Sequence, residues 1–395
     1  MAANGVFRDL VVIDIATLNA APQVATFFGD LGARVLKVEA PRGDPLRHLV
    51  DATGAALQWQ LANRNKECVT LDLTQVEGRQ VLDRLLAKAD LLVSALSGNH
   101  LRTWALDAES IRHRHPQLVH VNLTTFGTAG PWAERPGSGT LAEAATGLAH
   151  LTGAADGPPT LAPVGLGDHL GVLHGIIAAL VGLFGRPNCA GVAIDAAMTD
   201  ALLGLMGQRL ALVARTGIDP GRHGNRFPTM APRNAYPTAD GRWIALTAGT
   251  NDLARRLFRA LGQPALADDA RFRSHRARLE NAAALDQLIA AWIQERPAEE
   301  AVNSLVAERV SAAAIDDLPT VLANPHFAAR QAFVHGTDET LGNWTSCLLT
   351  PGLGGAVRFL GRALGADNDA VLGEWLGLDA ATLATLRERG IVAAQ

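Results

Sequence analysis

LVVIDIATLNAAPQVATFFGDLGARVLKVE, residues 10–39, is the stretch that decides the fold. Residues 10–15 form an apolar run broken by a single aspartate, which is typical of a strand buried in a parallel sheet. Proline suits the first turn of a helix, so we predict a helix over residues 22–31, ended by Gly32. Residues 34–39 then alternate apolar and charged side chains, which predicts a second strand. The order strand, helix, strand indicates a right-handed unit of a parallel sheet.

The same alternation continues along the chain. Further strands are predicted at residues 68–73, 90–93 and 118–123, with an amphipathic helix at residues 76–88. This interval between strands predicts the α/β fold class, with a Rossmann-like, mostly parallel sheet in a large domain. The loop after the first strand lacks the Gly-x-Gly-x-x-Gly sequence, which argues against a nicotinamide cofactor.

The second half of the chain changes character. Two helices are predicted at about 168–186 and 195–216, and a strand at 242–246 precedes several amphipathic helices over about 252–312. Residues 356–359 and a helix near 380–389 are expected to pack back on the first domain. The resulting plan has a large domain over 1–216 completed by about 330–395, a Gly- and Pro-rich linker over 217–237, and a smaller α+β domain over 238–329.

Composition excludes several classes of protein. The formal net charge of −4 gives no electrostatic footprint for nucleic acid. The most apolar segment, residues 170–184, is shorter than the ~20 residues that span a bilayer, so a buried helix and no membrane are predicted. The first residues resemble a strand more than a signal peptide, which predicts a cytoplasmic location. Cys68, Cys189 and Cys347 are scattered, so we expect small buried side chains with no disulfide or metal site.

Asp168 is the residue most suggestive of chemistry. It lies in GLGDHLG, residues 165–171, after a glycine-rich turn and before a long apolar segment. At a helix N-terminus an aspartate can simply cap the helix. The same position also favours an ionised carboxylate, and the glycines around it would let a bulky ligand approach closely. Both interpretations stay open on these residues alone.

Other candidate binding residues are weaker. The small side chains of residues 18–22 follow the first strand, where open α/β sheets bind ligands, but a tight turn explains them equally well. The basic residues at 63–66, and Arg42 and Arg47, could hold phosphates or form ion-paired surface loops. His169 is more typical of a packed or solvated helical histidine than of a base.

Several motifs in order then carry a resemblance that covers nearly the whole chain. The chain resembles the family III CoA-transferases, which include formyl-CoA transferase, carnitine CoA-transferase and α-methylacyl-CoA racemase. The matching stretches are DLGARVLKVEAPRGD (30–44), NRNKECVTLDL (63–73), GLGDHLG (165–171), GNRFPTMAPRNAYPTADGRW (224–243) and LGLDAATLATLRERGIV (376–392).

The resemblance implies that Asp168 is the nucleophile of an enzyme that moves coenzyme A from an acyl-CoA to a carboxylic acid. An aspartyl anhydride and then an aspartyl-CoA thioester would form, without metal or redox cofactor. Gly165, Gly167 and His169 would form the substrate and oxyanion neighbourhood. The resemblance also implies an interlocked homodimer of ring-like chains. It places coenzyme A along Asn19, Ala20, Ala21, Arg42, Leu71, Leu96 and Arg102.

Two departures from the family pattern bear on the reaction. Racemases of the family have a histidine where this chain has Ser138-Gly139, so transfer is favoured over racemisation, which needs two opposed acid–base groups. Arg102 lies one place earlier than in many transferases, which weakens the expected CoA contacts there. Two alternatives stay open: an epimerase or intramolecular CoA shift with His169 or Glu143 as second acid–base group, and a non-catalytic CoA-binding protein.

Overall fold

A computed structural model describes residues 5–186 and 191–394. The described residues fall into two compact units. The first, which we call the sheet unit, lies within residues 1–147, 162–208 and 325–395. The second, the helical unit, comprises residues 148–161 and 209–324. Each is described by itself.

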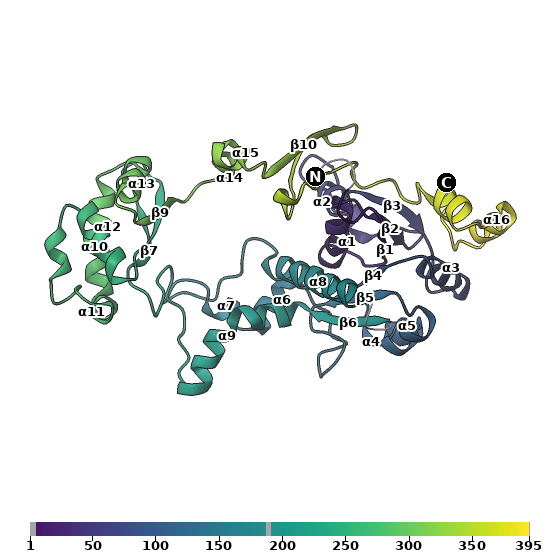
Figure 1. The fold of residues 1–395 in the computed structure, drawn as a ribbon, viewed down its shortest axis with the longest axis horizontal. Helices are drawn as coiled ribbons and strands as arrows, with labels where there is room; N and C mark the ends of the chain where they lie inside the picture. Colours follow the sequence, from purple (N-terminus) through teal and green to yellow (C-terminus); the bar gives the residue numbers. More distant parts are fainter. Residues whose placement is uncertain (1–4, 187–190, 395) are drawn as a thin grey trace. The chain divides into compact units, whose positions relative to one another are not determined.

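A six-stranded parallel sheet forms the centre of the sheet unit, in the order β3-β2-β1-β4-β5-β6 (Figure 1). This order is that of the Rossmann fold. The strand order reverses between the neighbouring strands β1 and β4, because the chain returns from β3 at one edge to place β4 beside β1. The strands are β1 (Val11–Asp14), β2 (Arg34–Glu39), β3 (Lys66–Thr70), β4 (Leu91–Ser94), β5 (Val119–Thr124) and β6 (Val192–Ala197).

Helices cover both faces of this sheet. On one face, α1 (Ala20–Asp30) contacts β1, β2, β4 and β5, and α8 (Leu166–Gly185) contacts β5 and β6. α3 (Val76–Leu86) buries its leucines in an apolar cluster with Ile13 and Leu92 of the strands. The remaining elements of this unit before residue 208 are η1 (Pro45–His48), α2 (Leu57–Ala62), α4 (Gly98–Thr103), α5 (Ala108–Arg114), α6 (Gly139–Ala145) and the first half of α9 (Met198–Thr216).

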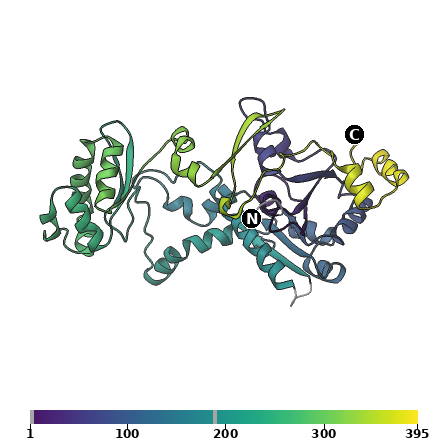
Figure 2. The ribbon, with the colours of Figure 1, turned by 45° about the horizontal axis from the view of Figure 1, so that its top comes forward.

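The C-terminal segment completes the sheet unit, as the yellow and purple parts of the ribbon show side by side (Figure 2). The Asn65 N–H donates to the Phe359 carbonyl at 3.0 Å, and the Cys68 N–H donates to the Asp367 carboxylate at 2.8 Å. Leucines of α16 join the apolar cluster of α3. The elements here are α15 (Pro325–Ala329), the hairpin β10 (Phe333–Asp338) and β11 (Gly342–Cys347), η4 (Pro351–Leu353), η5 (Asp369–Trp375) and α16 (Ala380–Glu388).

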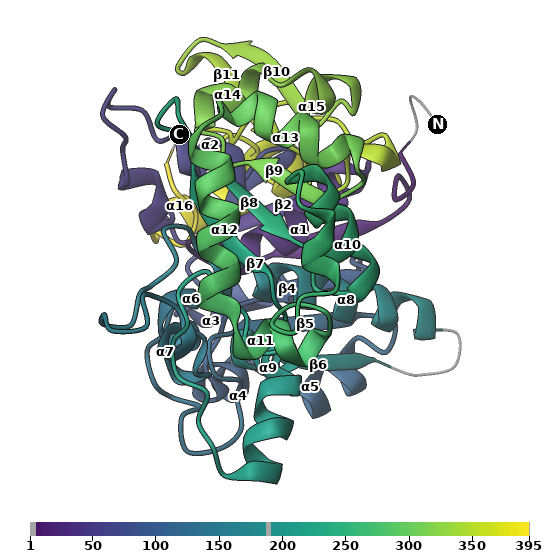
Figure 3. The same ribbon diagram turned by 90° about the vertical axis from the view of Figure 1, so that its left-hand side faces the viewer.

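The helical unit packs helices against a three-stranded antiparallel sheet, ordered β7-β8-β9 (Figure 3). Its core joins the aromatic residues Tyr236, Phe258 and Phe272 to leucines and isoleucines of the helices. The elements are α7 (Leu148–Leu151), β7 (Arg233–Pro237), β8 (Trp243–Thr247), α10 (Asn251–Ala260), η3 (Pro264–Ala267), α11 (His275–Glu280), α12 (Ala282–Gln294), α13 (Ala298–Ala307), β9 (Ser311–Ala314) and α14 (Leu318–Ala323). The predicted fold class, a Rossmann-like parallel sheet with a smaller α+β part, is confirmed.

Three local predictions differ from the structure. Residues 192–197 form β6, where a helix was predicted to begin at 195, because pairing with β5 outweighs the helical preference of alanine. Residues 233–237, assigned to the linker, form β7; its Pro237 is accommodated at the end of an edge strand. The predicted domain limits of 1–216, 217–237 and 238–329 also lie at other residues than the limits of the two compact units.

The apolar segment of residues 170–184 lies inside a helix close to the predicted limits of about 168–186. α8 has 20 residues, and by length and composition it could cross a membrane, although glycines and alanines on one side of it pack inside the sheet unit. Among the cysteines, Cys68 is buried as expected, Cys347 is exposed, and Cys189 lies outside the described residues.

Candidate active site

Asp168 lies in the first turn of α8 and does not cap it. The helix begins after Gly165, the N-cap residue, and no side chain donates or accepts a capping hydrogen bond there. The capping interpretation of Asp168 is therefore wrong. Its carboxylate is half-buried, and one of its oxygens contacts the start of α6.

The two oxygens of this carboxylate have different surroundings. Oδ1 accepts the backbone N–H of Gly139 at 3.0 Å. Oδ2 accepts no hydrogen bond from any residue that the structure describes. A Cβ atom on Gly165 would lie 2.9 Å from Oδ2, so the missing side chain of this exposed glycine leaves Oδ2 uncovered. One oxygen is thus held by a hydrogen bond, and the other has no such partner among the described residues.

Close approach of two helices explains the other glycines. A Cβ atom on Gly139 would lie 2.2 Å from the backbone nitrogen of Asp168, and one on Gly167 would lie 2.3 Å from the Gly139 carbonyl oxygen. No side chain fits at such distances. Glycine at both positions lets the start of α6 pack directly against the first turn of α8, which brings the Gly139 N–H to Asp168.

No cationic side chain among the described residues pairs with the Asp168 carboxylate. Burial raises the pKa of its carboxyl, the Gly139 N–H opposes this, and the nearby Glu143 carboxylate raises the pKa further. Glu143 is 2% exposed and accepts the Gly167 N–H at 2.9 Å. The Gly167 amide is therefore occupied by Glu143. Of the predicted neighbourhood, Gly165 and His169 stay predictions, and the structure adds the Gly139 N–H.

A pocket of ≈ 480 Å³ opens beside the first turns of α1 and α8. Asn19 and Gln23 line it from α1 and its cap, and His169 lines it from α8. The Asn19 side-chain oxygen accepts from Gln23 at 3.0 Å. His169 is exposed. The structure thus brings together the predicted residues Asn19 and His169, with Ala20 and Ala21 buried in the same first turn of α1.

The other predicted CoA contacts lie at the carboxyl ends of neighbouring strands, where open α/β sheets bind ligands. Leu96 follows β4, and its backbone is fixed by a pair of hydrogen bonds of 2.8 and 2.9 Å to the Asn122 side chain. Leu71 follows β3 and is 1% exposed, so only its backbone could contact a ligand. Arg42 and Arg102 are exposed. Arg102 lines a separate cavity of ≈ 160 Å³.

The sequence does not indicate the contacts that two residues of the site make. Gly139 marks the place of an absent histidine and Glu143 is a candidate second acid–base group, but their bonds to Asp168 and Gly167 are not predicted. The Gly137-Ser138-Gly139 sequence was the available signal, because paired glycines mark close backbone approach. Among the described residues, no group of three His, Cys, Asp or Glu side chains could hold a metal ion.

The family model and the similar proteins of known activity all name CoA-transferases. The model of CoA-transferase family III matches residues 7–359. The chain is 34% identical to succinyl-CoA–D-citramalate CoA-transferase of Chloroflexus aurantiacus, over 97% of each chain. It is 32% identical to the β subunit of succinyl-CoA–L-malate CoA-transferase of the same organism, over 96% of each.

Solved structures agree. A CaiB/BaiF family protein from Brucella suis superposes with a TM-score of 0.77 at 28% identity, covering 94% of this chain and 100% of that one. Rv3272 from Mycobacterium tuberculosis superposes with a TM-score of 0.81 at 26% identity, covering 93% and 99%. With a half-buried carboxylate held at the start of α8, and a match over most of its length, the chain belongs to CoA-transferase family III and is a CoA-transferase.

Proposed function

We propose that this protein transfers coenzyme A from an acyl-CoA to a carboxylic acid through covalent intermediates on Asp168. The observation that carries the proposal is the asymmetric carboxylate: Oδ1 is fixed by the Gly139 N–H, and Oδ2 is uncovered beside Gly165. A nucleophile needs one free oxygen in a defined direction, and this arrangement supplies it.

The proposed reaction needs no co-reactant. The Asp168 carboxylate attacks the thioester carbonyl, the C–S bond breaks, and a mixed anhydride and the CoA thiolate form. The thiolate then attacks the aspartyl carbonyl, which releases the donor acid and leaves an aspartyl-CoA thioester. The acceptor carboxylate repeats both steps in reverse order, collects the CoA and restores Asp168.

The raised pKa of Asp168 fits this role. A carboxylate without a cationic partner is a better nucleophile than one whose charge a lysine or arginine neutralises, because nucleophilicity increases with basicity. The Gly139 N–H, which already contacts Oδ1, would hold that oxygen as negative charge moves through the tetrahedral intermediates. Gly165 would leave room for the thioester.

The names of the relatives suggest which substrates to test first. Their names include succinyl-CoA as donor and citramalate, malate and glutarate as acceptors or partner acids. We therefore propose succinyl-CoA as donor and a dicarboxylic acid as acceptor. Coenzyme A would lie over Asn19, Ala20 and Ala21 and the backbones after β3 and β4. Arg42 and Arg102, both exposed, would meet its phosphates.

Racemisation is the weaker alternative. The residue that faces Asp168 from α6 is Gly139, which has no side chain to act as an acid or a base. Glu143 is committed to the Gly167 N–H, and His169 lines the neighbouring pocket from the following position of α8. These contacts favour transfer.

We further propose a cytoplasmic homodimer. An apolar stripe on α8 supports the dimer: Leu173, Ile177, Val181 and Phe184 are 37%, 60%, 66% and 90% exposed along one side of the helix. Sedimentation of the wild type as a monomer at micromolar concentration would contradict this part of the proposal.

Trapping the intermediate tests the mechanism. Hydroxylamine added with succinyl-CoA should convert Asp168 to a hydroxamate, which peptide mass spectrometry detects as a fixed mass increase on residues 165–171. The Asp168→Asn protein is the control and should show none. A wild-type enzyme that turns over but is never modified at Asp168 would remove the covalent mechanism.

A further inference from the structure

Four charged side chains are buried beneath the loop between β1 and α1. We call Asp14, Lys37, Asp44 and Lys66 the buried charge cluster; each side chain is 0% exposed. Lys37 lies 3.7 Å from Asp14 and 3.3 Å from Asp44, and Lys66 lies 2.8 Å from Asp14. Two positive and two negative charges therefore lie together inside the sheet unit, and the ion pair of Glu39 with Arg47 lies beside them.

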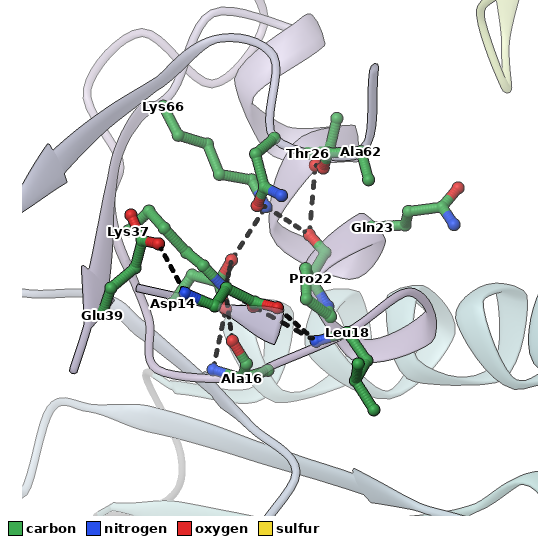
Figure 4. Close-up of polar contacts among 12 residues, drawn as sticks. Asp14, Ala16, Leu18, Pro22, Gln23, Thr26, Lys37, Glu39, Ala62 and Lys66 are labelled. Atoms are coloured by element: carbon green, nitrogen blue, oxygen red, sulfur yellow. Dashed lines mark hydrogen bonds and ion pairs between the residues drawn. The ribbon is translucent and has the colours of Figure 1, made fainter. Parts of the chain in front are cut away.

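The lysines bind the backbone on both sides of the loop (Figure 4). The Lys37 ammonium donates a hydrogen bond to the Ala16 carbonyl, at the start of the loop. The Lys66 ammonium donates to the Pro22 carbonyl at 2.8 Å, in the first turn of α1. The two ends of residues 16–22 are thus held by two charges from β2 and β3.

The aspartates hold the N–H groups of the same segment. Asp14 accepts the Ala16 N–H at 2.9 Å, and Asp44 accepts the Leu18 N–H at 3.2 Å. Leu18 has a φ of 64°, in the left-handed region that is unfavourable for a residue with a side chain. A charged acceptor on its N–H compensates for this unfavourable conformation.

The segment that these charges hold is the one that enters the proposed site. Asn19 follows Leu18 directly and lines the same pocket as His169. The side chains of the cluster contact the backbone at residues 16, 18 and 22 and make no bond to the Asn19 side chain, which pairs with Gln23 at the pocket wall. The conformation of residues 19–21 therefore depends on charges that no ligand can reach.

We propose that the buried charge cluster positions the loop of residues 16–22 for binding the CoA moiety, and that Lys37, Lys66, Asp14 and Asp44 are positioning residues. This inference rests on the proposed function, in which residues 19–21 contact coenzyme A. A purely stabilising role is a poorer explanation, because apolar residues of similar volume stabilise a core at least as well as buried ion pairs. Charges are needed where backbone groups of a strained loop must be held.

Lys66 gives the cluster a sensitivity to pH. Its three N–H groups match three acceptors: Asp14 at 2.8 Å, the Pro22 carbonyl at 2.8 Å and the Asn63 side chain at 3.0 Å. Burial lowers the pKa of Lys66 to about 8, Asp14 opposes the change and Lys37 adds to it. The Cys68 thiol and the Asp30 carboxylate of α1, which is paired with Arg64, also lie near enough to interact with Lys66. Loss of one proton leaves three acceptors for two N–H groups, so we expect the loop to loosen above that pH.

Binding of acetyl-CoA to the Asp168→Asn protein, measured by calorimetry, tests the inference. This protein cannot turn the ligand over, and the sulfur of acetyl-CoA is in a thioester, so no free thiol of the ligand ionises as pH rises. Asp44→Asn and Lys66→Met are added to this background; the first keeps the shape of the side chain, and the second keeps its length. We expect the affinity to fall about tenfold or more in each. In the active enzyme, KM for the CoA donor should rise while KM for the acceptor acid stays within about twofold.

Glu67→Gln is the matched control. It removes an ion pair of 2.8 Å with Arg34 between the same strands β2 and β3, away from the loop. It should leave acetyl-CoA affinity unchanged. The affinity of the parent should also weaken as pH rises above about 8, and this step should be absent in Lys66→Met.

The outcomes separate the two proposals. Folded Asp44→Asn or Lys66→Met proteins that bind acetyl-CoA like the parent would overturn the inference and leave the transferase mechanism intact. A parent protein that binds no acetyl-CoA would overturn the proposed function, and the inference with it. If Lys66→Met does not fold, Asp44→Asn and the pH dependence of the parent decide.

Discussion

Aspartates occupy two contrasting environments in the sheet unit. Asp168 is half-buried, accepts one backbone N–H and has Glu143 as its charged neighbour. Asp14 and Asp44 are completely buried, yet each lies next to a lysine. Burial without a cation raises the pKa and leaves a basic, reactive oxygen, whereas burial with a cation fixes both groups in place. The same side chain thus serves chemistry in one environment and positioning in the other.

The strongest test of this contrast removes one charge from each environment. Asp168→Asn should lower kcat by about 10⁴-fold or more, because no nucleophilic oxygen remains. Asp14→Asn should instead lower the free energy of unfolding by about 3–5 kcal/mol, because two buried lysines lose a shared carboxylate. Steady-state kinetics and urea unfolding of both variants measure the two effects.

The sign of the stability change at Asp168 follows from its raised pKa. Between the ordinary pKa of aspartate and the raised value, the folded state binds more protons than the unfolded state. Ionised Asp168 therefore lowers stability as pH rises through this range, and the cost persists at neutral pH. Asp168→Asn should be at least as stable as the wild type at pH 7, with no gain below pH 4. Equal destabilisation by Asp168→Asn and Asp14→Asn would contradict the contrast.

A smaller effect is expected from covering the free oxygen. The Cβ atom of Gly165→Ala would lie 2.9 Å from Oδ2, at the end of a side chain that can shift, so the fold should tolerate it. We expect kcat/KM to fall about 10–100-fold through misdirection of the carboxylate. Gly204→Ala, in α9, is the control, because nothing lies within 4 Å of the added atom. Full activity of Gly165→Ala would mean that Oδ2 does not attack.

The smallest effect concerns the acidic neighbour. Glu143→Gln keeps an oxygen for the Gly167 N–H and removes the charge that raises the pKa of Asp168. The acid limb of the kcat/KM profile, where Asp168 must lose its proton, should therefore move to lower pH by less than about one unit. A shift to higher pH would show that Glu143 does not repel the Asp168 charge.

The sequence predicted the elements whose patterns are local. Alternating strands and helices over residues 10–39 predicted the parallel sheet. The glycines around Asp168 marked it as a candidate, and its role as nucleophile is what the family resemblance implies. β6 escaped prediction, since VAIDAA becomes a strand only by pairing with β5. The alternation in RVLKVE predicted a strand but not its surroundings: Lys37 is 0% and Glu39 3% exposed, because their partners come from other strands and loops.

Contacts between distant segments explain the remaining failures at the site. The Gly139 N–H reaches Asp168 across 29 positions of the chain, and Lys66 reaches Asp14 across 52. Neither pairing leaves a periodic signal in the sequence. The CoA contacts taken from the resemblance at Asn19, Leu96 and Arg102 stay predictions, as does the interlocked dimer.

The C-terminal closure of β3 has a consequence for synthesis on the ribosome. The Thr70 N–H of this edge strand donates to Asn368, and the Asp72 N–H donates to the Ile391 carbonyl. Until residues 359–391 leave the exit tunnel, the nascent sheet exposes unpaired edge groups of the kind through which chains aggregate. Protection by chaperones over most of translation would therefore matter more for this protein than for one whose sheet is closed by its own early residues.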